Sequence, residues 1–181
     1  RRILHIAHLQ IAAGEKVAIL GRNGAGKSTL LRMLNGFVQP TGGHIRIDGL
    51  PVFPLQSDNT LRQVRSQMGQ VLQGLHLVPR LTALENTVVG GLSRMPLLRS
   101  WMRLFTQAEM EQAQAALQSV GMWHLAHKRA DQLSGGERQK VAIARMLMQK
   151  PRWVLADEPT AALDPTAAEE VCRLLVQASQ D

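Results

Sequence analysis

Cysteine and aromatic residues are scarce in this sequence. Its 181 residues include one cysteine and no tyrosine, with three phenylalanines and three tryptophans. A single thiol excludes an internal disulfide and fits a reducing compartment. We expect this residue, Cys172, to be a small buried side chain on a helix.

Long hydrophobic runs and clusters of basic residues are absent as well. No stretch reaches the ~18 uninterrupted apolar residues of a membrane-spanning helix. The first ten residues mix charged, histidine and apolar side chains too finely for the apolar core of a signal peptide. The net charge of +7 would suit nucleic acid, an anionic membrane or a phosphate-rich ligand. The basic residues are scattered and have almost no aromatic neighbours to stack bases, so charge alone does not select a partner and a solvated surface is the default. Our expectation for the whole chain is that it has no nucleic-acid partner.

Short apolar runs alternate with amphipathic stretches along the chain. Runs typical of strands buried on both faces of a parallel sheet lie at residues 16–20, 68–72 and 153–156. Residues 44–49 alternate as a half-buried antiparallel strand does. Helices are expected, several behind capping boxes or an Asp-Pro start, over residues 27–36, 82–92, 106–120, 134–148 and from 164 onward. This alternation predicts an α/β fold with a parallel sheet and a helical insertion.

A glycine-rich segment follows the first apolar run. Residues 21–28 fit the pattern G-x-x-x-x-G-K-[ST] between a strand and a helix. Glycines let the backbone curl so that N–H groups point at phosphate oxygens, and the positive helix end adds to that field. Lys27 then neutralises the β- and γ-phosphates while the Ser28 hydroxyl ligates Mg²⁺. The nucleotide-binding candidates are Gly21, Arg22, Asn23, Gly24, Ala25, Gly26, Lys27, Ser28 and Thr29.

Two carboxylates follow the last apolar run. Asp157 and Glu158 come directly after residues 153–156, and the carboxyl ends of parallel strands carry phosphate sites. Asp157 is therefore a candidate Mg²⁺ ligand, and Glu158 is a candidate general base that polarises the attacking water. The alternative is a solvated acidic turn, which the glycine-rich segment upstream disfavours.

A second glycine-rich helix start lies at residues 133–139, Leu-Ser-Gly-Gly-Glu-Arg-Gln. Ser134 is positioned to cap the helix, while Gly135 and Gly136 leave backbone N–H groups uncovered at its positive end. One domain needs only one P-loop, so this second anion-binding element is expected to serve the nucleotide of another molecule. An ordinary capped helix is the alternative.

In this order, the three segments resemble those of the ATP-binding cassette (ABC) ATPases. Residues 21–28 match Walker A, residues 133–139 match the signature motif, and residues 153–158 match Walker B. The resemblance implies a P-loop NTPase with a RecA-like parallel sheet core, a small antiparallel β subdomain and an inserted helical subdomain. It implies one domain over 1–181, with 1–73 and 136–181 forming the β subdomain and core, and 74–135 the helical subdomain.

The resemblance also assigns roles to single residues. Gln73 matches the Q-loop glutamine, which contacts Mg²⁺ and faces a membrane subunit, and Asp164 matches the D-loop at the dimer interface. The residues implied to contact the ATP of a second cassette are Ser134, Gly135, Gly136 and Glu137. The implied catalytic residues are Glu158, Lys27 and Gln73, and the implied Mg²⁺ ligands are Ser28, Gln73 and Asp157.

Two elements of these ATPases are not found. No Tyr, Phe or Trp precedes Gly21 to stack on adenine, and no histidine follows His127 to act as the switch histidine. The chain also begins with Arg rather than Met. We therefore expect a domain that is incomplete at both ends and hydrolyses ATP poorly as a fragment. The complete protein is expected to be an ATPase.

The resemblance predicts the energy-coupling subunit of a bacterial importer, using ATP and Mg²⁺. The partners it implies are a second ABC ATPase subunit in a homodimer, transmembrane permease subunits and a periplasmic or lipid-anchored substrate-binding protein, at the cytoplasmic face of the inner membrane. Residues 73–86, 89–92, 101–105 and 128–133 resemble phosphonate-import ATPases, so phosphonate or a related oxyanion is the expected cargo. The alternatives are an importer ATPase for polar amino acids, a soluble ABC ATPase acting on ribosomes or DNA, and a degenerate cassette that only binds ATP.

Overall fold

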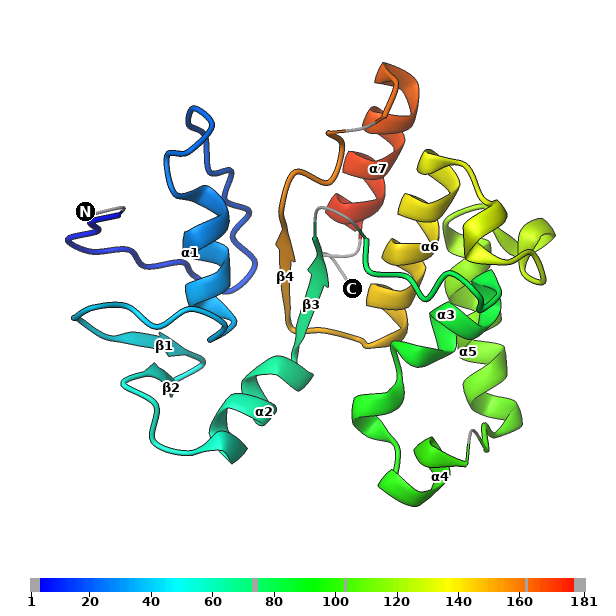
Figure 1. Ribbon diagram of the computed structural model, residues 1–181, viewed down its shortest axis with the longest axis horizontal. Coiled ribbons are helices and arrows are strands. Elements are labelled where there is room, and N and C mark those ends of the chain that lie inside the picture. Colours follow the sequence, from blue (N-terminus) through cyan, green and yellow to red (C-terminus); the bar gives the residue numbers. More distant parts are fainter. Residues whose placement is uncertain (1–3, 73–74, 103, 162, 178–181) are drawn as a thin grey trace. The chain divides into compact units, whose positions relative to one another are not determined.

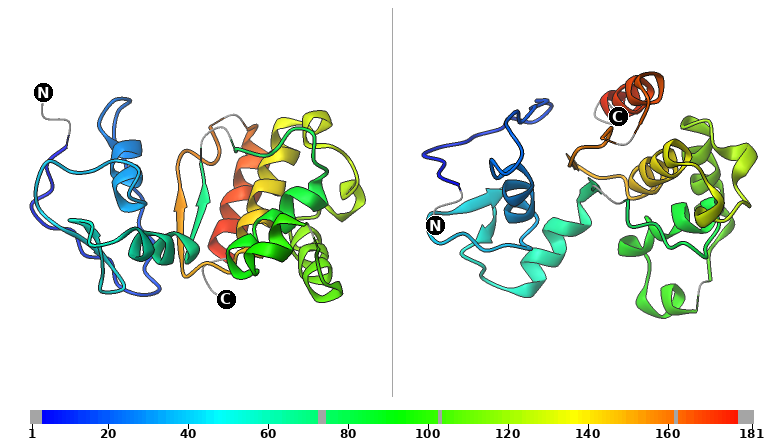
Figure 2. Two further views of the ribbon diagram at one scale, coloured as in Figure 1. Left: turned by 60° about the horizontal axis from the view of Figure 1, so that its bottom comes forward. Right: turned by 45° about the horizontal axis from the view of Figure 1, so that its top comes forward.

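A computed structural model describes residues 4–72, 75–102, 104–161 and 163–177 of the chain. It divides the protein into two compact units, residues 1–65 and 66–179 (Figures 1 and 2). None of the helices in these described ranges is both long enough and apolar enough to span a bilayer.

In chain order, the N-terminal unit contains one helix, a hairpin and a second helix (Figure 1). Its elements are α1 (Lys27–Leu34), β1 (Ile45–Ile47), β2 (Leu50–Phe53) and α2 (Asp58–Ser66). Strands β1 and β2 pair antiparallel through Ile47 and Leu50, and the turn between them has positive φ angles of 49° at Asp48 and 76° at Gly49. Such a two-residue turn favours Asp-Gly. The antiparallel strand predicted over 44–49 is thus confirmed, although it ends before the turn.

Helix α2 was not predicted, and it packs against the end of α1. Gly36 follows Asn35, the C-cap of α1, with a φ of 70°, and a Cβ at Gly36 would lie 2.5 Å from the Leu61 side chain of α2. Arg65 Nε donates to the Asn35 carbonyl at 2.9 Å, and its guanidinium lies 4.5 Å from the centre of the Phe37 ring. These contacts fix α2 to the C-terminal end of α1.

The strand predicted over residues 16–20 is not present in the described structure. No strand pairs with this segment, and the Leu20 side chain is 91% exposed. A strand forms only when a neighbour accepts and donates its ladder hydrogen bonds. Neither the β1–β2 pair nor the β3–β4 pair includes residues 16–20, so apolar composition alone did not make them a strand.

The C-terminal unit is built on two parallel strands. Strand β3 (Met68–Val71) pairs with β4 (Trp153–Ala156) in the register Met68 to Trp153 and Val71 to Ala156. This pair confirms the predicted parallel strands, but only β3 is mainly buried. Strand β4 is half-buried along its length, so the prediction of burial on both faces is wrong for β4, whose one strand neighbour in the described residues is β3.

Helices fill most of the rest of the C-terminal unit. They are α3 (Ala83–Val89), η1 (Leu92–Arg94), α4 (Leu97–Trp101), α5 (Gln107–Ser119), η2 (Trp123–Leu125), η3 (Ala130–Gln132), α6 (Gly135–Met148) and α7 (Pro165–Gln177). The predicted helices are confirmed, except that α3 ends at Val89, just before the two glycines Gly90 and Gly91.

Helix α6 is the centre of this unit. It packs against α3 and α5 on one side and α7 on the other (Figures 1 and 2). The shared core includes Val88, Leu117, Val141 and Ile143, all fully buried. A Cβ at Gly90 would lie only 2.0 Å from the Arg145 carbonyl oxygen, so glycine is what lets the end of α3 touch the backbone of α6.

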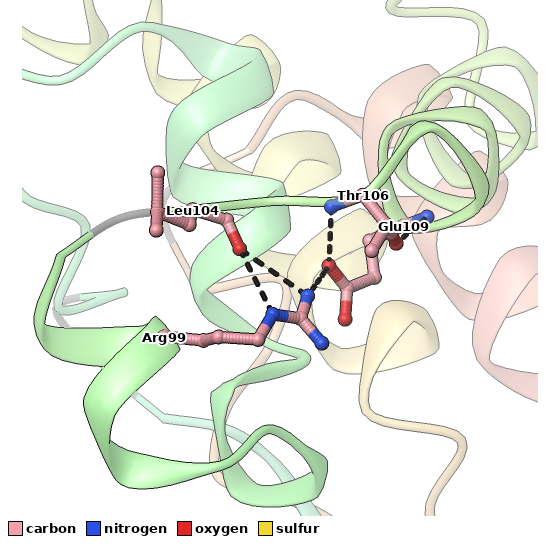
Figure 3. Close-up of polar contacts among 4 residues, drawn as sticks. All are labelled: Arg99, Leu104, Thr106 and Glu109. Atoms are coloured by element: carbon pink, nitrogen blue, oxygen red, sulfur yellow. Dashed lines mark hydrogen bonds and ion pairs between the residues drawn. The ribbon is translucent and has the colours of Figure 1, made fainter.

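A polar contact holds the segment between α4 and α5 (Figure 3). Arg99 of α4 donates to the Leu104 carbonyl from Nε at 3.3 Å and from Nη2 at 3.2 Å, and Nη2 also reaches Glu109 Oε2 at 2.6 Å. Glu109 in turn forms the predicted capping box with Thr106 at the start of α5. The connection is therefore tied to the first turn of α5, although Leu104 within it is 53% exposed and Trp101 at the end of α4 is 83% exposed.

Helix α7 begins as predicted but does not bury its cysteine. Asp164 Oδ1 accepts a hydrogen bond from the Ala167 N–H at 3.0 Å, which confirms the N-cap before Pro165. The buried face of α7 carries Val171 and Leu174, three positions apart. Cys172 lies off that face and is exposed, so the expected burial of this thiol is wrong.

Candidate functional site

The glycine-rich loop enters α1 through residues with left-handed backbone. Gly24 has a φ of 80°, and Gly26, the N-cap of α1, has a φ of 96°. Both conformations are easily adopted only by glycine. No side chain in the described structure caps α1, so the positive end of this helix is not compensated by a side-chain oxygen.

The Lys27 side chain folds back over this loop. Its Nζ donates to the Gly21 carbonyl at 2.8 Å and lies 3.4 Å from the Arg22 carbonyl. Residues 21–25 are exposed, so an anion can reach the loop. A curled backbone, a bare helix end and an ammonium group together form an arrangement suited to binding phosphate.

The two carboxylates lie where β4 ends. The Asp157 N–H donates to the Val71 carbonyl at 2.9 Å, which extends the β3–β4 pairing by one residue and leaves Asp157 only 8% exposed. Glu158 follows with an exposed side chain and a φ of 48°. A left-handed conformation at a residue other than glycine costs about 1–3 kcal/mol and is concentrated at functional sites. The pair thus offers one buried and one accessible carboxylate at adjacent positions.

The signature segment forms a reciprocal cap on α6. Ser134 Oγ accepts from the Glu137 N–H at 3.3 Å, and Glu137 Oε2 accepts from the Ser134 N–H at 2.7 Å. The hydrogen bond from the Ser134 backbone lowers the pKa of Glu137, which keeps this carboxylate ionised at the helix start. A Cβ at Gly135 would meet no heavy atom of the described residues within 4 Å, so the first residue of α6 faces open space.

The signature segment and the start of α7 are neighbours. A Cβ at Gly136 would lie 3.8 Å from the Leu163 side chain and 3.9 Å from Ala167. One turn further along, Lys140 Nζ and Glu170 Oε2 form an ion pair at 2.6 Å. The structure therefore places the candidate D-loop residue Asp164 on a segment that packs against the signature helix.

Gln73, the remaining candidate, lies outside the described residues. The segment after it, residues 75–82, is held by two side chains that the sequence had not singled out. Arg145 of α6 donates to the carbonyls of Leu75 and His76, and Asn86 of α3 bonds to the backbone of residues 78, 81 and 82. Both are polar residues within mainly apolar helices, and buried polar groups need partners. That pattern could have revealed them.

The candidates are divided between the two units. The glycine-rich loop, with Lys27 and Ser28, belongs to residues 1–65, whereas Ser134, Asp157, Glu158 and Asp164 belong to residues 66–179. Within the second unit, the end of β4 and the segment after β3 follow adjacent parallel strands, and the signature and D-loop segments are in contact.

Comparison with known proteins shows the family to which the chain is related. The family model described as "ABC transporter" matches residues 4–161. A phosphonates import ATP-binding protein PhnC of Rhodopseudomonas palustris is 46% identical over 97% of this chain and 62% of its own length. The PhnC protein of Bordetella parapertussis is 43% identical over 97% of this chain and 70% of its own length. The chain spans 62–64% of the length of the first curated relatives that it matches.

Solved structures show the same fold. The ATP-binding cassette MJ0796, solved as a post-hydrolysis dimer bound to ADP and Pi, is 35% identical with a TM-score of 0.79, over 95% of this chain and 72% of that chain. The cbiO1 protein from Clostridium perfringens, part of the ABC transporter complex cbiONQ, is 32% identical with a TM-score of 0.79, over 95% of this chain and 65% of that chain. The predicted fold class, a P-loop NTPase of the ABC type, is confirmed.

Proposed function

Because the chain belongs to the ABC transporter family, we propose that it is the ATP-binding and ATP-hydrolysing subunit of an ABC importer. The observation that carries the proposal is the Lys27 ammonium group, held at 2.8 Å from the Gly21 carbonyl over a glycine loop that opens α1. A cation, a curled backbone and an uncapped helix start converge there. This is the chemistry that a triphosphate requires.

Binding starts at the glycine-rich loop. The backbone N–H groups of residues 21–29 surround the phosphates, and Lys27 turns from the Gly21 and Arg22 carbonyls to the β- and γ-phosphate oxygens. These contacts position the γ-phosphate and neutralise its charge, and in phosphoryl transfer positioning and charge neutralisation account for most of the catalysis.

Mg²⁺ fits the residues that the chain offers. The Ser28 hydroxyl and the Asp157 carboxylate would supply hard oxygen ligands, and Gln73 would supply an amide oxygen. The described residues contain no group of three or more His, Cys, Asp or Glu side chains that could hold a metal by themselves. Mg²⁺ in nucleotide sites is held by one or two protein oxygens together with phosphates, so such a group is not required. When bound, the ion neutralises charge on the β- and γ-phosphates.

Hydrolysis is assigned to Glu158. Its carboxylate is exposed at the end of β4, beside the more buried Asp157, and as general base it orients and deprotonates the attacking water. The Ser134 cap and the Gly135–Gly136 backbone of a second copy close on the γ-phosphate, with Asp164 at the same interface. The dimeric cassette structure at 35% identity supports a homodimer.

Relatives that share more than two fifths of the sequence support phosphonate as the cargo. The two PhnC proteins are described as phosphonate importers at 46% and 43% identity, so we assign this chain to the uptake of phosphonate or a related oxyanion. The implied partners are transmembrane permease subunits and a substrate-binding protein, with the cassette at the cytoplasmic face of the membrane. Residues 74–135 form the helical subdomain of this proposal, and residues 1–73 and 136–181 form its β subdomain and core.

The test uses the complete protein together with the permease and the binding protein encoded beside its gene. Reconstituted in proteoliposomes, the complex should hydrolyse ATP faster when the binding protein is loaded with an alkylphosphonate. If a polar amino acid stimulates and phosphonate, phosphite and phosphate do not, the assignment of cargo is wrong while the ATPase assignment stands. If the Glu158→Gln complex hydrolyses ATP at the parental rate, the assignment of the base is wrong.

A further inference from the structure

Arg145 holds together two segments that are far apart in the sequence. It lies on α6, the helix that begins at the signature segment, and is three residues from the end of that helix. Its Nη2 donates to the Leu75 carbonyl at 2.7 Å and its Nη1 to the His76 carbonyl at 2.8 Å. One guanidinium group therefore bridges the signature helix to the chain that leads from β3 into α3.

The backbone of the two accepting residues, Leu75 and His76, has an unusual conformation. Leu75 has a φ of 59° and His76 a φ of 45°. Consecutive left-handed residues other than glycine are unfavourable, and they persist only where surrounding contacts impose them. The fork of the guanidinium group can bond two acceptors at once, which a lysine ammonium on its flexible stem does not reproduce. The contact is thus specific to arginine.

The backbone of Arg145 is also held in place, by contact with the end of α3. Its backbone carbonyl is the atom that a Cβ at Gly90 would meet at 2.0 Å, so α3 and α6 touch at this residue. Burial lowers the pKa of Arg145, as expected for a cation enclosed by protein. Asn86 of the same α3 holds residues 78, 81 and 82 with four hydrogen bonds of 2.8–3.2 Å. Leu75 and His76 are therefore attached to α6, and residues 78, 81 and 82 to α3.

We propose that Arg145 is a positioning residue that makes residues 75–82 move with the signature helix. Because the N-terminal end of α6 is where a second cassette's nucleotide would bind, engagement of that end is transmitted along α6 to these residues. This inference rests on the proposed function. It adds that the Arg145 side chain carries the effect of occupancy at the signature segment to Leu75 and His76, beside the backbone hydrogen bonds that join residues 79–82 to residues 129–131.

Hydrogen exchange measured by mass spectrometry on the complete protein tests the contact. In the nucleotide-free protein, Arg145→Lys should speed exchange in peptides covering residues 75–82 roughly tenfold, because the strained backbone is released. Arg99→Lys is the matched control, since Arg99 also donates two N–H groups to a loop carbonyl, that of Leu104. It should change exchange only near residues 99–106. Unchanged exchange over 75–82 in Arg145→Lys would overturn the proposal.

Transmission is tested in the Glu158→Gln background, in which bound ATP is not turned over. Adding MgATP should slow exchange over both residues 134–140 and residues 75–82. With Arg145→Lys added, residues 134–140 should still respond, whereas the response over residues 75–78 should be lost. Equal responses of both segments in the two proteins would refute the coupling. If the complete protein binds no ATP, the proposed function fails, whereas the nucleotide-free exchange still decides on the contact.

Turnover separates positioning from simple stabilisation. In the otherwise native protein, Arg145→Lys should lower kcat at least about fivefold, while KM for ATP stays within about twofold. A lower melting temperature with unchanged kcat would show a structural role only and contradict the proposal. If Arg145→Lys does not fold, the neutral Arg145→Gln, which has no guanidinium fork for the two carbonyls, replaces it, and the same decoupling is expected.

Discussion

The chain contains two glycine-rich helix starts that differ in how their positive ends are compensated. At α1, glycines and Lys27 surround an N-terminus that no described side chain caps. At α6, the Ser134–Glu137 capping box satisfies the helix start from within, and an ionised carboxylate already compensates its positive end. An incoming phosphate therefore gains more at α1 than at α6. The first site is suited to holding a nucleotide firmly, and the second to engaging it reversibly.

The largest effect is expected from Glu158→Gln, which allows the contact at the start of α6 to be measured by itself. Glu158→Gln removes the base and leaves the phosphate contacts, so kcat should fall by about a thousandfold while ATP affinity is kept. Because ATP then remains bound, size-exclusion chromatography with MgATP should show a dimer of the complete protein. The lifetime of that dimer measures the α6 contact. A variant that turns over normally would assign the base elsewhere.

The next largest effect is expected from a substitution in the glycine-rich loop before α1. Lys27→Ala in the complete protein should weaken ATP binding by at least about a hundredfold, because the cation on the β- and γ-phosphates is lost. Titration with a fluorescent nucleotide measures this loss. Lys16→Ala, at another lysine of the same unit that is exposed, is the control and should bind normally. Equal affinity of the two variants would contradict the assignment of the P-loop.

A smaller effect compares two capping boxes. Ser134→Ala and Thr106→Ala remove equivalent caps, from α6 and α5 respectively, and each should lower the free energy of unfolding by about 1 kcal/mol. Urea denaturation measures both. Only Ser134→Ala should also shorten the lifetime of the ATP-bound dimer in the Glu158→Gln background. If Thr106→Ala shortens it equally, the signature cap has no special part in binding.

The smallest effect concerns the charge on the α6 cap. Hydrogen bonding lowers the pKa of Glu137 in the folded protein, so its ionised form stabilises the fold above the unfolded pKa of about 4.3. This contribution is lost as pH falls through the lower, folded pKa. Glu137→Gln keeps a capping side chain without the charge. It should be less stable than the native protein by a few tenths of a kcal/mol at pH 7.

Thermal unfolding across pH checks this expectation. The difference between the native protein and Glu137→Gln should shrink as pH falls from about 5 to below the folded pKa. Glu109, whose pKa is lowered by the same kind of cap at Thr106, is present in both proteins and cancels in the difference. A constant difference over this range would mean that the charge of Glu137 does not support α6.

Local signals in the sequence predicted much of this structure. Thr106, Ser134 and Asp164 each cap a helix as the sequence indicates, because capping depends on residues within one turn. The parallel strands β3 and β4 were also recognisable from their apolar runs. Residues 16–20 carry a similar run without a strand, since pairing depends on a distant neighbour that composition does not specify.

The candidate site was predicted from local signals of the same kind. Lys27, Glu158 and Ser134 were singled out by their spacing from neighbouring glycines or apolar runs, and their roles stay predictions. Arg145 and Asn86 were missed because their partners are backbone carbonyls that any residue supplies. Helix α2 was missed as well, since its buried face has a single fully buried residue, Val64.

The uneven distribution of tryptophan has a spectroscopic consequence. Trp101, Trp123 and Trp153 all lie in the unit formed by residues 66–179, and the chain has no tyrosine. Intrinsic fluorescence excited at the indole band therefore follows the unfolding of this unit and is silent on the unit that carries Lys27. Trp101, the most exposed of the three, will be the first to be quenched by iodide. Its emission will shift to the blue when any binding partner covers α4.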